Sequence, residues 1–213
     1  MKTVTQAQST TEDIPRFDTL GLPLSVLVSC WSLLIFGFCG WNIYQDYRAE
    51  YTSVVTIALE SYNRDVIYRR WATMHGGVYV PATPKTPPNA SLAHLPERDI
   101  TLSSGKILTL MNPSYMTRQV HEMSTVLNGV RGHLTSLNPL RAQNVPDVWE
   151  KEALQLFEKG EKEHYSLAFL DGQRYLRFMR PLVTESGCLK CHAHQGYKTG
   201  DIRGGLSISV PWK

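Results

Sequence analysis

The feature that most constrains this chain is an apolar stretch near its N-terminus. Residues 19–45 contain no charged side chain, and Leu20–Tyr44 is dominated by Leu, Val, Ile, Phe and Trp. A helix that crosses the hydrocarbon core of a bilayer needs about 20 such residues. Trp41 and Tyr44 lie at one end, where amphipathic rings favour the headgroup level. The sequence therefore predicts a transmembrane helix over residues 20–45.

Three other interpretations of this stretch fit less well. The apolar run is too long for the core of a cleaved signal peptide, and no A-x-A-like cleavage site follows it. The segment Leu27-Val28-Ser29-Cys30 loosely matches a lipoprotein cleavage site, but apolar sequence continues well beyond Cys30. An uncharged stretch of this length is also longer than a buried helix of a soluble protein usually contains. We favour a membrane anchor.

The anchor divides the chain into three parts. Residues 1–19 are polar and lack apolar periodicity, so we expect a short cytoplasmic tail. Residues 46–213 are long enough for one globular domain. Apolar residues recur at helical spacing from Val54 to Trp71, and Gly76-Gly77 is the first stop signal. We therefore expect one long helix that continues from the membrane into the domain.

The rest of the domain mixes helices and strands. Residues 76–99 are rich in Pro, which predicts irregular structure. This segment is longer than an ordinary connection, so we expect it to cover a ligand site. A helix is expected at 113–128, and a second begins with a capping box at Asp147 and Glu150. Asp171-Gly172 indicates a hairpin, and the alternation at 206–210 indicates a final strand. This order predicts an α+β fold with an antiparallel sheet.

The motif that carries chemistry is Cys188-Leu189-Lys190-Cys191-His192. Two thiols at this spacing can add to the two vinyl groups of one haem, and the adjoining His192 can then supply an axial nitrogen to the iron. Covalent attachment of haem c by Cys188 and Cys191 is therefore the interpretation that we favour. Such attachment takes place outside the cytoplasm, which orients the anchor with its N-terminus inside and the domain in the periplasm.

Other uses of these cysteines fit the sequence less well. A zinc site would need four ligands, and Cys188, Cys191, His192 and His194 lie too close along the chain to surround one tetrahedral ion easily. A redox dithiol would open a helix after a buried strand in a βαβ pattern, which the sequence lacks. A structural disulfide remains a further alternative. The charge balance of 22 basic against 19 acidic residues, without a basic run, argues against nucleic-acid binding.

The second axial position of the iron is left open by the sequence. His75 at the end of the long helix is the favoured distal ligand, and Met116 is a weaker candidate. An empty or water-filled position that takes a small gas is an equal alternative. The remaining candidates are Met111, His121 and Met123, although core packing is the commoner role for a Met on an apolar helix face. Possible partners for haem propionates are Arg69, Arg70, Arg118 and Arg131.

Several stretches together resemble a bacterial family of PAS-like, c-type haem sensor domains that precede membrane-bound histidine kinases and diguanylate cyclases. These stretches are Arg70–Pro81, Leu95–Ile100, Leu110–Gln119, Thr135–Pro139, Pro146–Glu150, Cys188–Ala193 and Gly200–Gly205. The resemblance covers about residues 47–211. It implies a PAS-like antiparallel sheet with flanking helices, periplasmic exposure, His192 as proximal ligand and a second copy of the chain as partner in a homodimer. The distal Cys that some members carry in the first helix is missing around Ser61-Tyr62.

Two functions follow from these features. The first is a membrane-anchored, single-pass haem sensor in the inner membrane, which detects redox state or a small gas as the input domain of a receptor. The second is a membrane-tethered monohaem cytochrome that transfers electrons to a redox partner. No nucleophile elbow, phosphate loop or HExxH motif is present, so we expect no enzyme activity within this chain.

Overall fold

The computed structural model describes residues 23–192 and 195–212. The predicted tail and the first residues of the predicted membrane helix lie outside this described part. The chain divides into two units, residues 1–48 and 49–213, which we describe separately. The boundary falls inside the first helix and close to the end of the predicted membrane segment.

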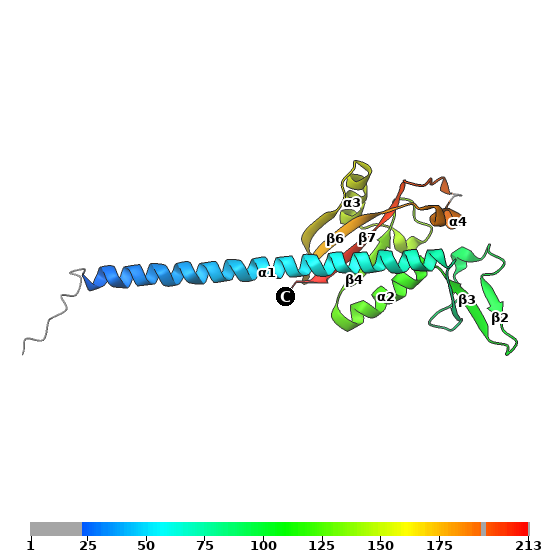
Figure 1. Ribbon diagram of the computed structural model, residues 1–213, viewed down its shortest axis with the longest axis horizontal. Coiled ribbons are helices and arrows are strands. Elements are labelled where there is room, and N and C mark those ends of the chain that lie inside the picture. The colour runs from blue at the N-terminus through cyan, green and yellow to red at the C-terminus, as the bar shows by residue number, and fades with distance from the viewer. Residues whose placement is uncertain (1–22, 193–194, 213) are drawn as a thin grey trace, which may run out of the picture. The chain divides into compact units, whose positions relative to one another are not determined.

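The first helix, α1, spans Leu24–Met74 (Figure 1). Its N-terminal section is apolar and exposed over a length sufficient to cross a membrane once. The expected long helix is confirmed, and it ends where Gly76 and Gly77 take positive φ angles of 73° and 109°. There the Gly77 N–H donates to the Ala72 carbonyl at 2.8 Å, which closes the last turn.

The second unit contains two antiparallel sheets, which confirms the α+β class. The smaller sheet has the order β1-β3-β2, and the larger has the order β4-β7-β6-β5. The strands are β1 Val78–Pro81, β2 Asp99–Thr101, β3 Ile107–Met111, β4 Arg131–Thr135, β5 His164–Leu170, β6 Gln173–Val183 and β7 Ile202–Pro211. The helices that accompany them are α2 Pro113–Asn128, α3 Val148–Glu158 and α4 Leu189–His192, with 3₁₀ turns η1 Ala90–Leu92, η2 Ala142–Asn144 and η3 Ser186–Cys188.

The larger sheet is covered on both faces. On one face, Phe178 of β6 and Ile208 of β7 pack with Ala58 of α1. On the other face, Met179 of β6 packs with Phe157 of α3. Successive side chains of a strand point to opposite faces, so β6 and β7 contribute to both layers. The core therefore lies in the two middle strands of this sheet.

Local sequence signals set the ends of the helices and the hairpin. Asn112 caps α2 by accepting from the Tyr115 N–H at 2.9 Å, and Gly129 ends that helix with φ 77°. Asp147 and Glu150 form the expected capping box at the start of α3. Asp171 and Gly172 join β5 to β6 with φ angles of 52° and 79°, as a two-residue hairpin with both central residues at positive φ requires.

The Cys–His motif is carried on an excursion between β6 and β7. These strands pair with each other up to Val183 and Ile202, with a register irregularity at Leu182/Val183. Just beyond, Thr184 donates its N–H to the Asp201 carbonyl at 2.8 Å and accepts from the Gly200 N–H at 2.9 Å. The intervening segment, with η3 and α4, thus begins and ends at one fixed point of the sheet.

Two details differ from the pattern predicted from the sequence. The Pro-rich segment 76–99 contains a strand, β1, which lies at an edge of the small sheet with Pro81 as its last residue, a place where Pro is tolerated. In β7, Ser207 and Ser209 are buried, although polar residues that alternate with apolar ones along a strand usually face solvent. The reason is that α3 and the loop before it cover this second face of the larger sheet, so neither face of β7 is left to solvent.

Replacing Leu206, which is fully buried in β7, by Ala should lower the free energy of unfolding by about 2–5 kcal/mol because it removes apolar contacts and leaves a cavity. Chemical denaturation of the full chain in detergent measures this change. The matched control is Leu127→Ala, since Leu127 is 85% exposed on α2, and its effect should stay within about 0.5 kcal/mol. Equal effects of the two substitutions would contradict the proposed core.

Candidate functional site

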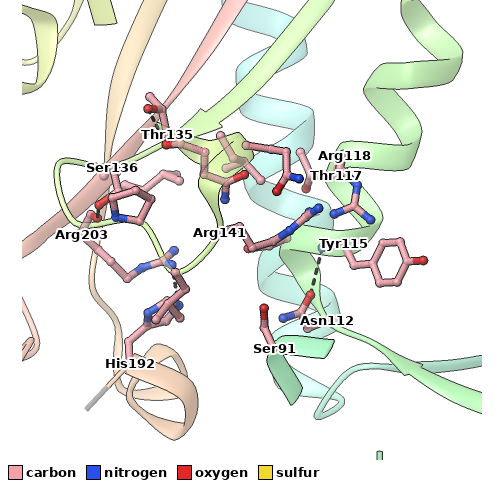
Figure 2. A pocket seen from close by; sticks show the side chains of 18 of the residues that line it. Ser91, Asn112, Tyr115, Thr117, Arg118, Thr135, Ser136, Arg141, His192 and Arg203 are labelled. Carbon is pink, nitrogen blue, oxygen red and sulfur yellow. Dashed lines mark hydrogen bonds between the residues drawn. The ribbon is translucent and has the colours of Figure 1, made fainter. Parts of the chain in front are cut away.

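A pocket of about 650 Å³ opens beside the Cys–His motif. Its volume lies within the range usual for cofactor and ligand sites. Its wall is built from α1, the segment around η1, α2, β4, the loop that follows β4, the end of β6, the segment from His192 to β7, and the start of β7. In the view of Figure 2, His192 and Arg203 lie on one wall and Asn112, Tyr115 and Arg118 on the opposite wall, with Arg141 projecting between them.

His192 is held by hydrogen bonds at both ring nitrogens. Its Nδ1 lies 2.6 Å from Oε1 of Gln195, and its Nε2 lies 2.8 Å from Nη1 of Arg203. A guanidinium only donates hydrogen bonds, so Nε2 must accept and carry its lone pair. The ring is therefore the neutral tautomer with the proton on Nδ1. That form presents Nε2 as a potential metal ligand at the pocket wall.

The motif segment also contacts the end of α1. Glu185 forms an ion pair with Arg70 of α1. A Cβ added at Gly187 would lie 2.5 Å from Cγ2 of Thr73, so a larger residue there would force the Thr73 side chain to move. Cys188 is a partly buried free thiol whose Sγ accepts from the Glu185 N–H at 3.4 Å. The side chain of Cys191 lies outside the described part of the structure.

A polar face of α1 meets α2 next to the pocket. Asp65 Oδ2 lies 2.5 Å from Nε2 of His121, and both side chains are buried. One turn further along, Arg69 donates to Oγ1 of Thr117 at 3.4 Å. Burial, followed by repulsion from Arg203, lowers the pKa of Arg69 to about 10, so its guanidinium remains charged at neutral pH. A buried cation at a pocket wall favours an anionic ligand.

The His121 ring is packed tightly against β4. A Cβ added at Gly132 would lie 2.2 Å from Nδ1 of this ring, so glycine is required for the close approach. Nδ1 of His121 is buried and has no hydrogen-bond partner among the described residues. Because Asp65 holds the other nitrogen, His121 has the arrangement of an imidazole oriented by a carboxylate.

His133 connects the pocket to a buried carboxylate in the core. Its Nδ1 lies 2.9 Å from Oε2 of Glu150, and its Nε2 lies 2.9 Å from the Gln143 carbonyl. Both partners are acceptors, so both ring nitrogens must donate and the ring is the imidazolium. Glu150 also accepts from Ser207 at 2.5 Å and lies 3.5 Å from Arg177. This network links η2, at the pocket wall, to α3 and the sheet.

The charges that line the pocket are mainly positive. Four arginines belong to the described wall and only one carboxylate, Glu122, does. Of the arginines predicted as carboxylate partners, Arg69 and Arg118 line the pocket, whereas Arg70 pairs with Glu185 and Arg131 pairs with Asp171 at 2.6 Å. Arg141 and Arg203 complete the wall. The pocket is suited to a ligand that carries carboxylates.

The two residues predicted as distal iron ligands lie elsewhere. The exposed ring of His75 stacks on Trp71 with centroids 4.5 Å apart, and its Nδ1 lies 2.8 Å from the Trp71 carbonyl. Met116 is half-buried on α2. Neither belongs to the described pocket wall, whereas His94, His121 and His133 share that wall with His192. The assignments to His75 and Met116 remain predictions.

Gln195, Arg203 and His133 were not singled out from the sequence. Gln195 and Arg203 both hydrogen-bond to His192. Their spacing in the sequence does not indicate that the folded chain brings them to this ring. A partial signal existed for the His133 network, because Glu150 was expected as a capping residue. The additional contacts of Glu150 to β4, β6 and β7 depend on the packing of α3 on the sheet, and a local sequence pattern gives no information about that packing.

Comparison with known proteins places the chain in a family. A family model described as Tll0287-like matches residues 45–211, which is most of the chain. The chain belongs to the Tll0287-like family. The resemblance inferred from the sequence is thereby confirmed at the level of the family. Among solved structures, that of the cyanobacterial haem protein Tll0287 matches with 14% identity and a TM-score of 0.39, over 48% of this chain and 74% of that one. No curated protein sequence matches significantly.

The hydrogen bond from Glu150 raises the pKa of His133 above its ordinary value of 6.5, although burial opposes the change. A pKa that is raised in the folded state adds stability that is complete below the unfolded value and is lost as pH rises through the folded value. Replacing His133 by Gln should therefore reduce the free energy of unfolding more at about pH 6 than at about pH 9. Denaturant titrations of both proteins at the two pH values measure this difference. A pH-independent difference would show that the His133 charge is not coupled to folding.

Proposed function

We propose that the second unit binds one haem covalently, with Cys188 and Cys191 as attachment points and His192 as axial ligand. The observation that carries this proposal is the tautomer of His192, which presents an Nε2 lone pair at the wall of a pocket of about 650 Å³. Membership of the Tll0287-like family, in which the matching solved structure is a haem protein, supports it.

The other wall residues suit a porphyrin. Leu134, Leu140 and Leu182 provide apolar contacts for a macrocycle. Arg69 and Arg118 can pair with its carboxylates. Because the lone pair of His192 cannot serve both Arg203 and an iron ion, a bound haem would require Arg203 to release it, and the guanidinium could then pair with a haem carboxylate.

The function that we favour is that of a sensor anchored in the inner membrane. Haem iron supplies one-electron redox chemistry and a site for small diatomic gases. Residues of α1 take part in the pocket and in the motif contacts through Arg69 and Thr73, and α1 is the same helix that carries the apolar segment. A change at the haem would therefore act directly on the helix that leads to the membrane. The proposed PAS-like description rests on the antiparallel sheet and its flanking helices.

The orientation and assembly form part of the same proposal. Attachment of haem to Cys188 and Cys191 outside the cytoplasm would place the second unit in the periplasm and the N-terminus in the cytoplasm. A single apolar helix of sufficient length supports one membrane crossing. A second copy of the chain is the proposed partner for signalling.

Electron transfer is the second candidate function. It is favoured by the exposure of Glu185 and Ser186 just before the attachment site, which leaves part of this segment accessible to a redox partner although Glu185 also pairs with Arg70. A tethered carrier would need such access. It would not need a change in α1 when the iron changes its oxidation state.

Replacing Cys188 and Cys191 together by Ser should abolish covalently bound haem, because no thioether can form. The full chain is produced with the haem-attachment machinery, and haem is measured by the pyridine assay and by the intact mass. Cys30→Ser combined with Cys39→Ser is the matched control, since both residues lie in the apolar section of α1 and should leave haem content unchanged. A wild-type chain without covalent haem would refute the proposed function.

Hydrogen exchange distinguishes the sensor from the carrier. The haem-loaded full chain in a lipid nanodisc is compared in the oxidised state, in the reduced state and with CO. The sensor proposal expects a change in deuterium uptake within residues 61–74 of α1 in at least one comparison, because these turns contact the pocket and the motif. Unchanged uptake together with rapid electron exchange with a soluble cytochrome would favour the carrier.

A further inference from the structure

We propose that Gln195 is a positioning residue that fixes the tautomer of His192 and thereby sets how strongly Nε2 donates to a metal. The part of this proposal that concerns the iron rests on the proposed function. The part that concerns the tautomer stands on hydrogen bonds within the chain.

The orientation of the Gln195 carboxamide is determined by its second partner. Its Nε2 lies 3.1 Å from the carbonyl oxygen of Asn138, and a carbonyl can only accept a hydrogen bond. The amide nitrogen therefore faces Asn138, and Oε1 faces Nδ1 of His192 at 2.6 Å. Because this oxygen can only accept, Nδ1 must carry the proton.

The opposite side of the ring requires the same tautomer. Arg203 donates from Nη1 to Nε2 at 2.8 Å, so Nε2 must be unprotonated. Two independent partners, one an acceptor and one a donor, thus agree on a single protonation form. In solution a neutral histidine prefers the proton on Nε2, which is the form that cannot offer this nitrogen to a metal. Gln195 and Arg203 together reverse that preference.

Ser136 ties the partners of His192 to each other. Its hydroxyl donates to the backbone carbonyl of Arg203 at 2.8 Å and accepts from the Asn138 N–H at 3.1 Å. The hydrogen bonds therefore form a closed ring that runs from Asn138 through Gln195, His192, Arg203 and Ser136 back to Asn138. This ring joins the loop after β4 to β7, so Gln195 is held by the sheet and not only by the short α4.

A hydrogen bond to the distant nitrogen of a metal-bound imidazole changes its basicity. Gln195→Glu supplies a charged acceptor, which should increase electron donation from His192, stabilise the ferric state and lower the reduction potential. Gln195→Leu removes the acceptor and should raise the potential. A residue that only filled space at position 195 would not give opposite shifts for these two substitutions.

The first experiment needs no haem. The full chain is produced without the haem-attachment machinery, labelled with ¹⁵N at histidine, and the ring nitrogens of His192 are observed by NMR in detergent. Because Arg203 alone would also hold the Nδ1–H form, Gln195 is tested in the Arg203→Leu background. We expect the Nδ1–H form in the wild type and in Arg203→Leu, and its loss in favour of Nε2–H when Gln195→Leu is added to Arg203→Leu. An Nε2–H form in Arg203→Leu, or no change when Gln195→Leu is added, would overturn the proposal.

The second experiment uses the haem-loaded chain. Spectroelectrochemical titration measures the reduction potential of the wild type, Gln195→Glu and Gln195→Leu. The matched controls are Gln155→Glu and Gln155→Leu, since Gln155 is exposed on α3 and lies outside the described pocket wall. Opposite shifts at position 195 with no shift at position 155 support the proposal, and equal potentials at position 195 contradict it. A wild-type chain without haem would refute the proposed function, and the NMR experiment would still decide the role of Gln195.

Discussion

The backbone pairing of β6 with β7 is the interaction on which the site depends. These strands are neighbours in the middle of the larger sheet, and their pairing continues to the two ends of the Cys–His excursion. The bonds of Thr184 to Gly200 and Asp201 close its base. A short helix such as α4 has little stability of its own, because only longer helices persist in isolation. The sheet therefore provides the rigidity that the motif lacks.

The first helix changes its role along its length. Val54 and Ala58 pack on the apolar face of the sheet, whereas Asp65 and Arg69 face α2 and the pocket. Buried polar groups are costly unless they are paired, so the Asp65–His121 and Arg69–Thr117 contacts must form together with the packing of α2. The same helix thus contributes apolar packing in one section and charge in the next.

The sequence predicted the elements whose signals are local. The limits of α2, the capping box of α3 and the Asp171-Gly172 hairpin follow from residues next to one another, and they agree with the structure. The buried face of α1 was predicted poorly, because Ile67 and Trp71 continue the apolar spacing and are nevertheless exposed. Their places toward α2 are taken by polar residues, and tertiary pairing rather than hydropathy selects those.

The guanidinium of Arg203 has a consequence for selectivity among metals. A histidine nitrogen with a free lone pair binds stray zinc or copper readily, and neighbouring thiolates would strengthen such binding. In this chain that nitrogen accepts a hydrogen bond from a cation, and Arg69 adds a second positive charge nearby. An incoming divalent ion must displace the first charge and is repelled by both. The two positive charges thus disfavour a bare metal ion at this nitrogen, whereas the haem proposed above would bring its iron inside an anionic ring.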